Sequence, residues 1–138
     1  MKFSLLNAQS ARNKTNILNE YIVNDNINIA AAITETWFTP DDEQLSNDIT
    51  PKGYEIYHVT RDGRRGGGVA LIAKSRFKPS AFPTQTFASF ESLSVKLSMK
   101  KPPSSQPQST DLQRNPLAHS YVNFKRFSRK CLNFEVIF

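Results

Sequence analysis

Apolar residues change their spacing along the first third of the chain in a way that predicts three consecutive elements. Residues 3–6 form a short, mostly apolar run that ends at Asn7 and predicts a buried strand. Asn13 is an N-cap residue type, and after it apolar residues recur on one face of a predicted helix: Ile17, Leu18, Tyr21 and Ile22. Residues 27–33 are apolar almost throughout, as is usual for a strand buried on both faces. The pattern is therefore strand, helix, strand.

A strand–helix–strand unit fixes where the polar residues after each strand will lie. Such units normally make a right-handed crossover between parallel strands, so both strands end at the same edge of the sheet. Asn7 follows the first strand and Glu35 follows the second. We therefore expect both side chains at the carboxyl edge, where open α/β sheets bind their ligands.

The middle of the chain predicts a hairpin followed by one more strand. Residues 39–42 form a turn that opens a short acidic helix or loop, and residues 54–59 alternate as a strand does. The glycine-rich connection 61–68 leads back into a second strand at 69–73. A last strand is predicted from three apolar residues in strict alternation: Leu93, Val95 and Leu97.

The net charge of +6 is concentrated after residue 99 and says little about the folded part. Residues 100–138 hold seven Lys or Arg and two acidic residues, a net of +5, which leaves +1 for residues 1–99. Residues 100–113 are rich in Pro, Ser and Gln and are expected to be disordered. Residues 114–138 mix aromatic with basic residues and show no clean period. We therefore expect a domain at 1–99 and a basic, low-order tail at 100–138.

Composition also excludes several classes of protein. The chain has no apolar run near the roughly 20 residues that span a bilayer, and its first ten residues lack a secretory signal pattern. The lone Cys131 cannot form an internal disulfide, and no Cys or His cluster has zinc-ligand spacing. We expect an intracellular protein, nuclear or cytoplasmic, without a membrane partner. No particular protein partner is indicated.

Four segments carry a resemblance to a known family. They are 6–14 (Leu-Asn-Ala-Gln-Ser-Ala-Arg-Asn-Lys), 33–37 (Ile-Thr-Glu-Thr-Trp), 66–71 (Gly-Gly-Gly-Val-Ala-Leu) and 90–93 (Phe-Glu-Ser-Leu). In this order and spacing they resemble the endonuclease/exonuclease/phosphatase family, most closely its non-LTR (LINE-type) retrotransposon branch. The resemblance covers residues 1–99, and the joint occurrence is far more specific than any single segment. It implies a truncated two-layered α/β sandwich, with the N-terminal half of the domain present.

The resemblance implies that the family activity is magnesium-dependent hydrolysis of a DNA phosphodiester. Glu35 matches the metal-binding glutamate, and Asn7 matches the asparagine that hydrogen-bonds the scissile phosphate or the catalytic network. Magnesium prefers hard oxygen ligands, which suits a strand-end carboxylate. The family's Tyr-Arg-Pro-Pro strand end, Asp-x-Asn loop and Ser-Asp-His segment are absent, and neither His58 nor His119 matches the missing base. We expect a fragment that is inactive as it stands.

Other residues leave alternatives open. Arg61, Arg64 and Arg65 could contact backbone phosphate or could lie in a merely solvated turn. The glycines at 66–68 lack the Lys-Ser/Thr of a phosphate-binding loop, so we interpret them as a hairpin and packing feature. We interpret Trp37 as covering the edge of the core rather than stacking on a base. His58 is interpreted as an ordinary strand residue.

Two other functions remain open from the sequence. One is a family member that acts on small phosphoesters, and the other is a non-enzymatic polypeptide, either nucleic-acid-binding through the basic tail or inert.

The tail itself can be interpreted as a frameshift product, because codons for residues 105–113 permit Thr-Thr-Thr-Val-Tyr-Arg-Pro-Pro in a shifted frame. Intron read-through is the rival explanation. Poor folding is also expected, because the strand at 93–97 has only an irregular tail to pack against.

Overall fold

The computed structural model describes residues 2–61, 66–83, 91–98, 121–128 and 131–137, which form two sheets and three helical segments. The elements, in chain order, are β1 (Phe3–Asn7), α1 (Thr15–Asn24), β2 (Ala30–Thr34), α2 (Glu43–Ile49), β3 (Tyr54–Val59), β4 (Val69–Lys74), the 3-10 turn η1 (Ser75–Phe77), β5 (Ser80–Phe82), β6 (Ser92–Ser98), β7 (Tyr121–Ser128) and β8 (Cys131–Ile137). None of the helices in these ranges is long and apolar enough to cross a membrane.

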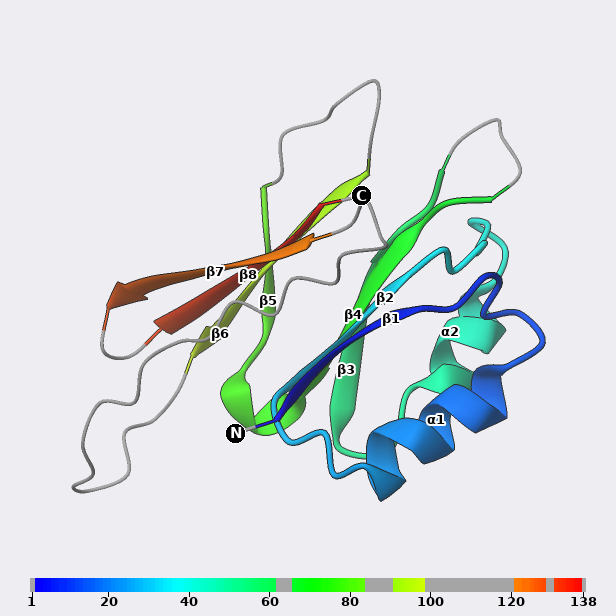
Figure 1. Ribbon diagram of the computed structural model, residues 1–138, viewed down its shortest axis with the longest axis horizontal. Coiled ribbons are helices and arrows are strands. Elements are labelled where there is room, and N and C mark those ends of the chain that lie inside the picture. The colour runs from blue at the N-terminus through cyan, green and yellow to red at the C-terminus, as the bar shows by residue number, and fades with distance from the viewer. Residues whose placement is uncertain (1, 62–65, 84–90, 99–120, 129–130, 138) are drawn as a thin grey trace.

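The first sheet has the strand order β1-β2-β4-β3 (Figure 1). β1 and β2 are parallel, as predicted, and their register pairs Asn7 with Thr34. β4 is antiparallel to both β2 and β3, so the predicted hairpin of β3 and β4 is confirmed. It follows that β1, β2 and β3 all run in one direction and end at one edge of the sheet.

The two faces of the first sheet are covered by different layers. α1 and α2 lie on one face, where Leu18, Ile22 and Ile49 pack against Ile33 and Ile72. The second sheet, with strand order β5-β6-β8-β7, lies on the other face (Figure 1). There the side chains of β6 join those of β2 and β4 in one buried cluster: Ala30, Ala32, Val69, Leu71, Ala73, Leu93, Val95 and Leu97. The mixed α/β sandwich expected from the sequence is thus confirmed.

Helix α1 differs from the prediction in its start and in its buried face. It begins at Thr15 after an N-cap at Lys14, so the predicted cap at Asn13 is wrong. Ile17 is 66% exposed, whereas Leu18 and Ile22 are buried. The helix contacts the sheet through a narrow stripe of buried side chains that includes Leu18 and Ile22, and Ile17 lies outside this stripe.

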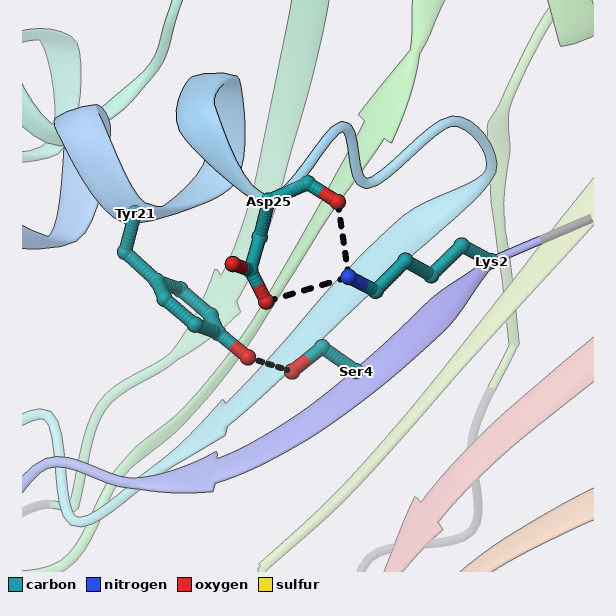
Figure 2. A network of polar contacts seen from close by, with 4 residues as sticks. All are labelled: Lys2, Ser4, Tyr21 and Asp25. Carbon is teal, nitrogen blue, oxygen red and sulfur yellow. Dashed lines mark hydrogen bonds and ion pairs between the residues drawn. The ribbon is translucent and has the colours of Figure 1, made fainter.

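Two contacts tie α1 to β1 at the amino edge of the sheet (Figure 2). The Nζ of Lys2 donates to the backbone oxygen of Asp25 at 2.8 Å and pairs with the Asp25 carboxylate at 3.1 Å. The hydroxyls of Ser4 and Tyr21 are 2.7 Å apart. A cation beside the last carbonyls of a helix also suits the helix dipole. Both contacts lie at the end of the sheet opposite Asn7.

The structure differs from the expected irregular tail at 121–128 and 131–137, where strands β7 and β8 pair with each other and β8 pairs with β6. The overlooked signal is the alternation of Leu132, Phe134 and Val136 with polar residues, which the preceding basic residues obscured. The predicted disorder of residues 100–113 lies outside the described residues. The basis for expecting poor folding is also overturned, because Leu93, Val95 and Leu97 are 6%, 1% and 0% exposed.

Candidate functional site

Three strands of the first sheet deliver polar residues to its carboxyl edge. β1 ends at Asn7, β2 is followed directly by Glu35, and β3 is followed by Arg61. Asn7 pairs with Thr34, so it stands one residue before Glu35 on the neighbouring strand. The predicted meeting of Asn7 and Glu35 at this edge is confirmed, and Arg61 joins them there. Their functional roles remain predictions.

The Glu35 carboxylate is held in place by two donors on one of its oxygens. The indole Nε1–H of Trp37 donates to Oε2 at 2.6 Å, and the backbone N–H of Gly67 donates to the same oxygen at 3.1 Å. The backbone N–H of Trp37 donates in turn to the oxygen of Gly67 at 2.9 Å. This closed set of bonds fixes the direction of the carboxylate, and among the described residues no hydrogen bond is made to its other oxygen, Oε1. Hydrogen bonds to an ionised carboxylate are stronger than those between two neutral groups.

The loops that follow β1 and β2 have unusual backbone conformations. Gln9, Ser10, Glu35 and Trp37 have φ angles of 45°, 77°, 54° and 57°, in the left-handed region that side chains disfavour. The loops support each other, because the N–H of Ser10 donates to the oxygen of Glu35 at 2.9 Å. Backbone strain of this kind clusters at functional sites, where the surrounding structure holds it. The strained loops therefore point to this edge independently of any motif.

The side chain of Asn7 stabilises its own turn. Its Oδ1 accepts the N–H of Gln9 at 3.1 Å, and the residue is otherwise exposed. The Nζ of Lys14 donates to the backbone oxygens of Ala8 at 2.6 Å and Gln9 at 3.2 Å, which anchors the loop from the start of α1. Among the described residues, the side-chain amide nitrogen of Asn7 donates to no other group, so it can serve as a donor at the edge. The sequence alone did not predict that Lys14 would anchor this loop.

Arg61 forms an ion pair with Glu91, the residue before β6. The pKa of Arg61 is raised, first by the hydrogen bond to Glu91 and also by the nearby negative charge of Glu35. Arg61 is thus a cation beside the Glu35 carboxylate, with its Nε committed to Glu91. A phosphate contact by Arg61 remains a prediction, and Arg64 and Arg65 lie outside the described residues.

The three consecutive glycines allow the β3–β4 hairpin to pass close to Glu35 and Thr36. Gly66, Gly67 and Gly68 have φ angles of 89°, 75° and 82°, which other residues rarely adopt. A Cβ on Gly68 would lie 2.6 Å from the Thr36 hydroxyl oxygen. The interpretation of these glycines as a hairpin and packing feature is confirmed.

Trp37 and His58 differ in how they relate to the edge. Trp37 is half-buried and donates to Glu35, a role that neither of the two interpretations from sequence included. His58 is half-buried in β3, and its ring meets that of Phe38 edge-on at 5.8 Å. Burial lowers the pKa of His58, so the fold favours its neutral form. This agrees with the interpretation of His58 as an ordinary strand residue.

The oxygen donors at this edge fit a magnesium ion that keeps most of its waters. The described residues contain no group of three or more His, Cys, Asp or Glu that could hold a metal. Glu35 offers one carboxylate and Asn7 a neutral amide, while Glu91 is already paired with Arg61. Magnesium is commonly held by one or two carboxylates together with waters and substrate phosphate.

The fold is similar to part of an AP endonuclease, of the endonuclease/exonuclease/phosphatase fold. One solved structure that matches is the crystal structure of AP endonuclease LMAP from Leishmania major, with a TM-score of 0.55 and 14% sequence identity. The match covers 70% of this chain and 35% of that chain, so the similarity spans about a third of the enzyme's length. No protein-family profile and no curated protein sequence matches the chain. At this identity the likeness establishes the fold alone.

Proposed function

We propose that the chain is the N-terminal part of a retrotransposon-type DNA endonuclease domain whose reaction is magnesium-dependent phosphodiester hydrolysis. The observation that carries the proposal is the Glu35 carboxylate, fixed by Trp37 and Gly67 at the strand-end edge beside Asn7. The partial similarity to an AP endonuclease fold supports it, as do the four motif segments. The 138 residues by themselves are proposed to be inactive.

Each residue at the edge has a definite chemical part in this proposal. Glu35 would hold the magnesium ion through Oε1, and the ion supplies positive charge against the phosphate. The side-chain amide of Asn7 would donate a hydrogen bond to a non-bridging phosphate oxygen. Hydrolysis also requires a base to activate water, and the sequence lacks the Ser-Asp-His segment that supplies it in the family. Binding of cation and phosphate is therefore separable from turnover in this chain.

Cation binding at Glu35 is tested with Tb³⁺, a hard cation whose emission is sensitised by a nearby indole. Trp37 is the sole tryptophan of the chain and donates to the Glu35 carboxylate, so bound Tb³⁺ should emit on indole excitation. We expect Glu35→Gln to abolish this emission, because it removes the carboxylate that would hold the cation. Excess Mg²⁺ should displace Tb³⁺ from the unaltered protein.

The matched control for this experiment is Glu20→Gln, which removes an exposed carboxylate on α1 by the same change. It should leave the terbium emission unchanged. Equal emission from the Glu35→Gln protein and the unaltered chain would show that the cation binds elsewhere, and the metal part of the proposal would fail.

We also propose that residues 100–138 derive from family sequence translated in a shifted frame. Support comes from the position of the permitted Tyr-Arg-Pro-Pro segment within 105–113 and from the apolar, helix-like spacing that the same shift permits through residue 128. The pairing of β8 with β6 and of β7 with β8 bears on neither this origin nor intron read-through, since many unrelated sequences can form paired strands. The nucleotide sequence decides: without a shifted frame encoding a Tyr-Arg-Pro-Pro-like segment and then an Asp-x-Asn loop, this origin is wrong.

A further inference from the structure

The guanidinium of Arg61 occupies the space beside Gly67 that a side chain would need. A Cβ on Gly67 would lie 2.7 Å from both Cζ and Nε of Arg61 and 3.1 Å from its Nη1. Approach this close is open only to glycine, which also adopts the φ of +75° found there. The planar guanidinium therefore packs directly against the Gly67 backbone.

The same glycine holds the Glu35 carboxylate through its backbone. The N–H of Gly67 donates to Glu35 Oε2 at 3.1 Å, and the oxygen of Gly67 accepts the N–H of Trp37 at 2.9 Å. Gly67 therefore supplies a donor to the carboxylate and an acceptor to the Trp37 backbone, and its position helps to set where the carboxylate points.

Glu91 in turn fixes Arg61 from the second sheet. The Arg61 side chain is 32% exposed and the Glu91 side chain only 10% exposed. The Nε of Arg61 donates to Glu91 Oε1, while Glu91 Oε2 is buried without a hydrogen-bond partner among the described residues. The largely buried Glu91 carboxylate is paired with Arg61, and this ion pair holds the guanidinium in one place.

We propose that Arg61 is a positioning residue for Glu35, acting through the Gly67 backbone. Glu91 holds the guanidinium, the guanidinium confines Gly67, and the Gly67 amide orients the carboxylate. In this role Arg61 touches neither the cation nor the substrate phosphate. The link from β6 to the carboxyl edge means that the second sheet takes part in shaping the site. The orientation of Glu35 by Arg61 through Gly67 does not depend on the proposed function. The consequence for cation binding does rest on it.

The test uses two optical measurements on the full chain, both reported by Trp37. Arg61→Gln should weaken Tb³⁺ binding by about 10-fold, the lower end of what outer-shell substitutions cost metal sites. Acrylamide should also quench Trp37 more strongly in this variant, because the indole loses its fixed contact with Glu35. Arg61→Lys should fail to restore either property, since a single ammonium cannot reproduce the planar packing.

A double variant separates positioning from general destabilisation. Arg61→Gln leaves Glu91 as a buried unpaired charge, whereas Arg61→Gln with Glu91→Gln removes that charge and regains stability. Positioning predicts that the double variant still binds Tb³⁺ as weakly as the single variant, although it is more stable. Recovery of Tb³⁺ affinity together with stability would overturn the proposal.

The matched control removes an ion pair at the opposite edge. Asp25→Asn breaks the Lys2–Asp25 pair by neutralising one of its two partners and should alter neither measurement. The proposal is wrong if Arg61→Gln leaves quenching as in the unaltered chain, or if Asp25→Asn has an equal effect. Where the unaltered chain shows no Glu35-dependent Tb³⁺ emission, the proposed cation site fails, and Trp37 quenching alone decides the positioning role.

Discussion

Supercoiled plasmid incubated with Mg²⁺ and the purified 138-residue chain should be nicked no faster than plasmid in buffer alone. Glu35 and Asn7 can place a cation and a phosphate, but the motif segments that carry the base and the remaining phosphate contacts are absent from the sequence. Catalytic groups that act as a unit fail together, and losing a single member can cost about a millionfold in rate. Conversion of supercoiled to open-circular DNA on a gel is the measurement.

The control for contaminating nuclease is Glu35→Ala, purified in parallel. Both preparations should give the same background. Nicking by the unaltered chain that disappears in Glu35→Ala would show that these 138 residues already contain a working site, and the inactive assignment would then be abandoned.

Leu97→Ala should lower the free energy of unfolding by about 2–5 kcal/mol, the range for truncating a fully buried leucine. Leu97 is 0% exposed and packs from β6 against the β2 and β4 side chains of the first sheet. For a domain of this size the midpoint of thermal unfolding should fall by roughly 10 °C. Circular dichroism during heating provides the measurement.

Ile17→Ala is the matched control, because Ile17 is a large aliphatic residue that is 66% exposed on α1. It should change the stability by about 0.5 kcal/mol or less, as surface substitutions do. Equal effects of the two substitutions, or the lack of any cooperative transition, would contradict the packing of the second sheet on the first.

The parts of the fold that the sequence predicts are those governed by local periodicity. Helical spacing around Leu18 and Ile22 and the apolar run before Thr34 were enough to predict β1-α1-β2, and the crossover rule then placed Asn7 beside Glu35. The glycines at 66–68 likewise marked the hairpin. Each of these signals lies within a few residues of the feature that it predicts.

The contacts that organise the site were beyond the sequence because they join distant segments. Gly67 reaches Glu35 across 32 positions and Arg61 reaches Glu91 across 30, and both contacts depend on how the strands and sheets pack. The N-cap at Lys14 and the strands β7 and β8 were missed for a different reason. At the start of α1, Asn13 is the residue type that usually caps a helix, and it drew the prediction away from Lys14. In the tail, the basic and aromatic residues obscured the alternation of apolar residues in β8.

The parallel register of β1 and β2 determines where insertions can be tolerated. Because side chains in a strand alternate between faces, one residue added within β1 would turn every later side chain of that strand to the opposite face. Asn7 would then leave its place beside Thr34. One residue added between Asp25 and Ile29, at the amino edge, would leave that register unchanged. Length variation among related chains should therefore collect at the amino edge, while β1 and β2 keep a constant length.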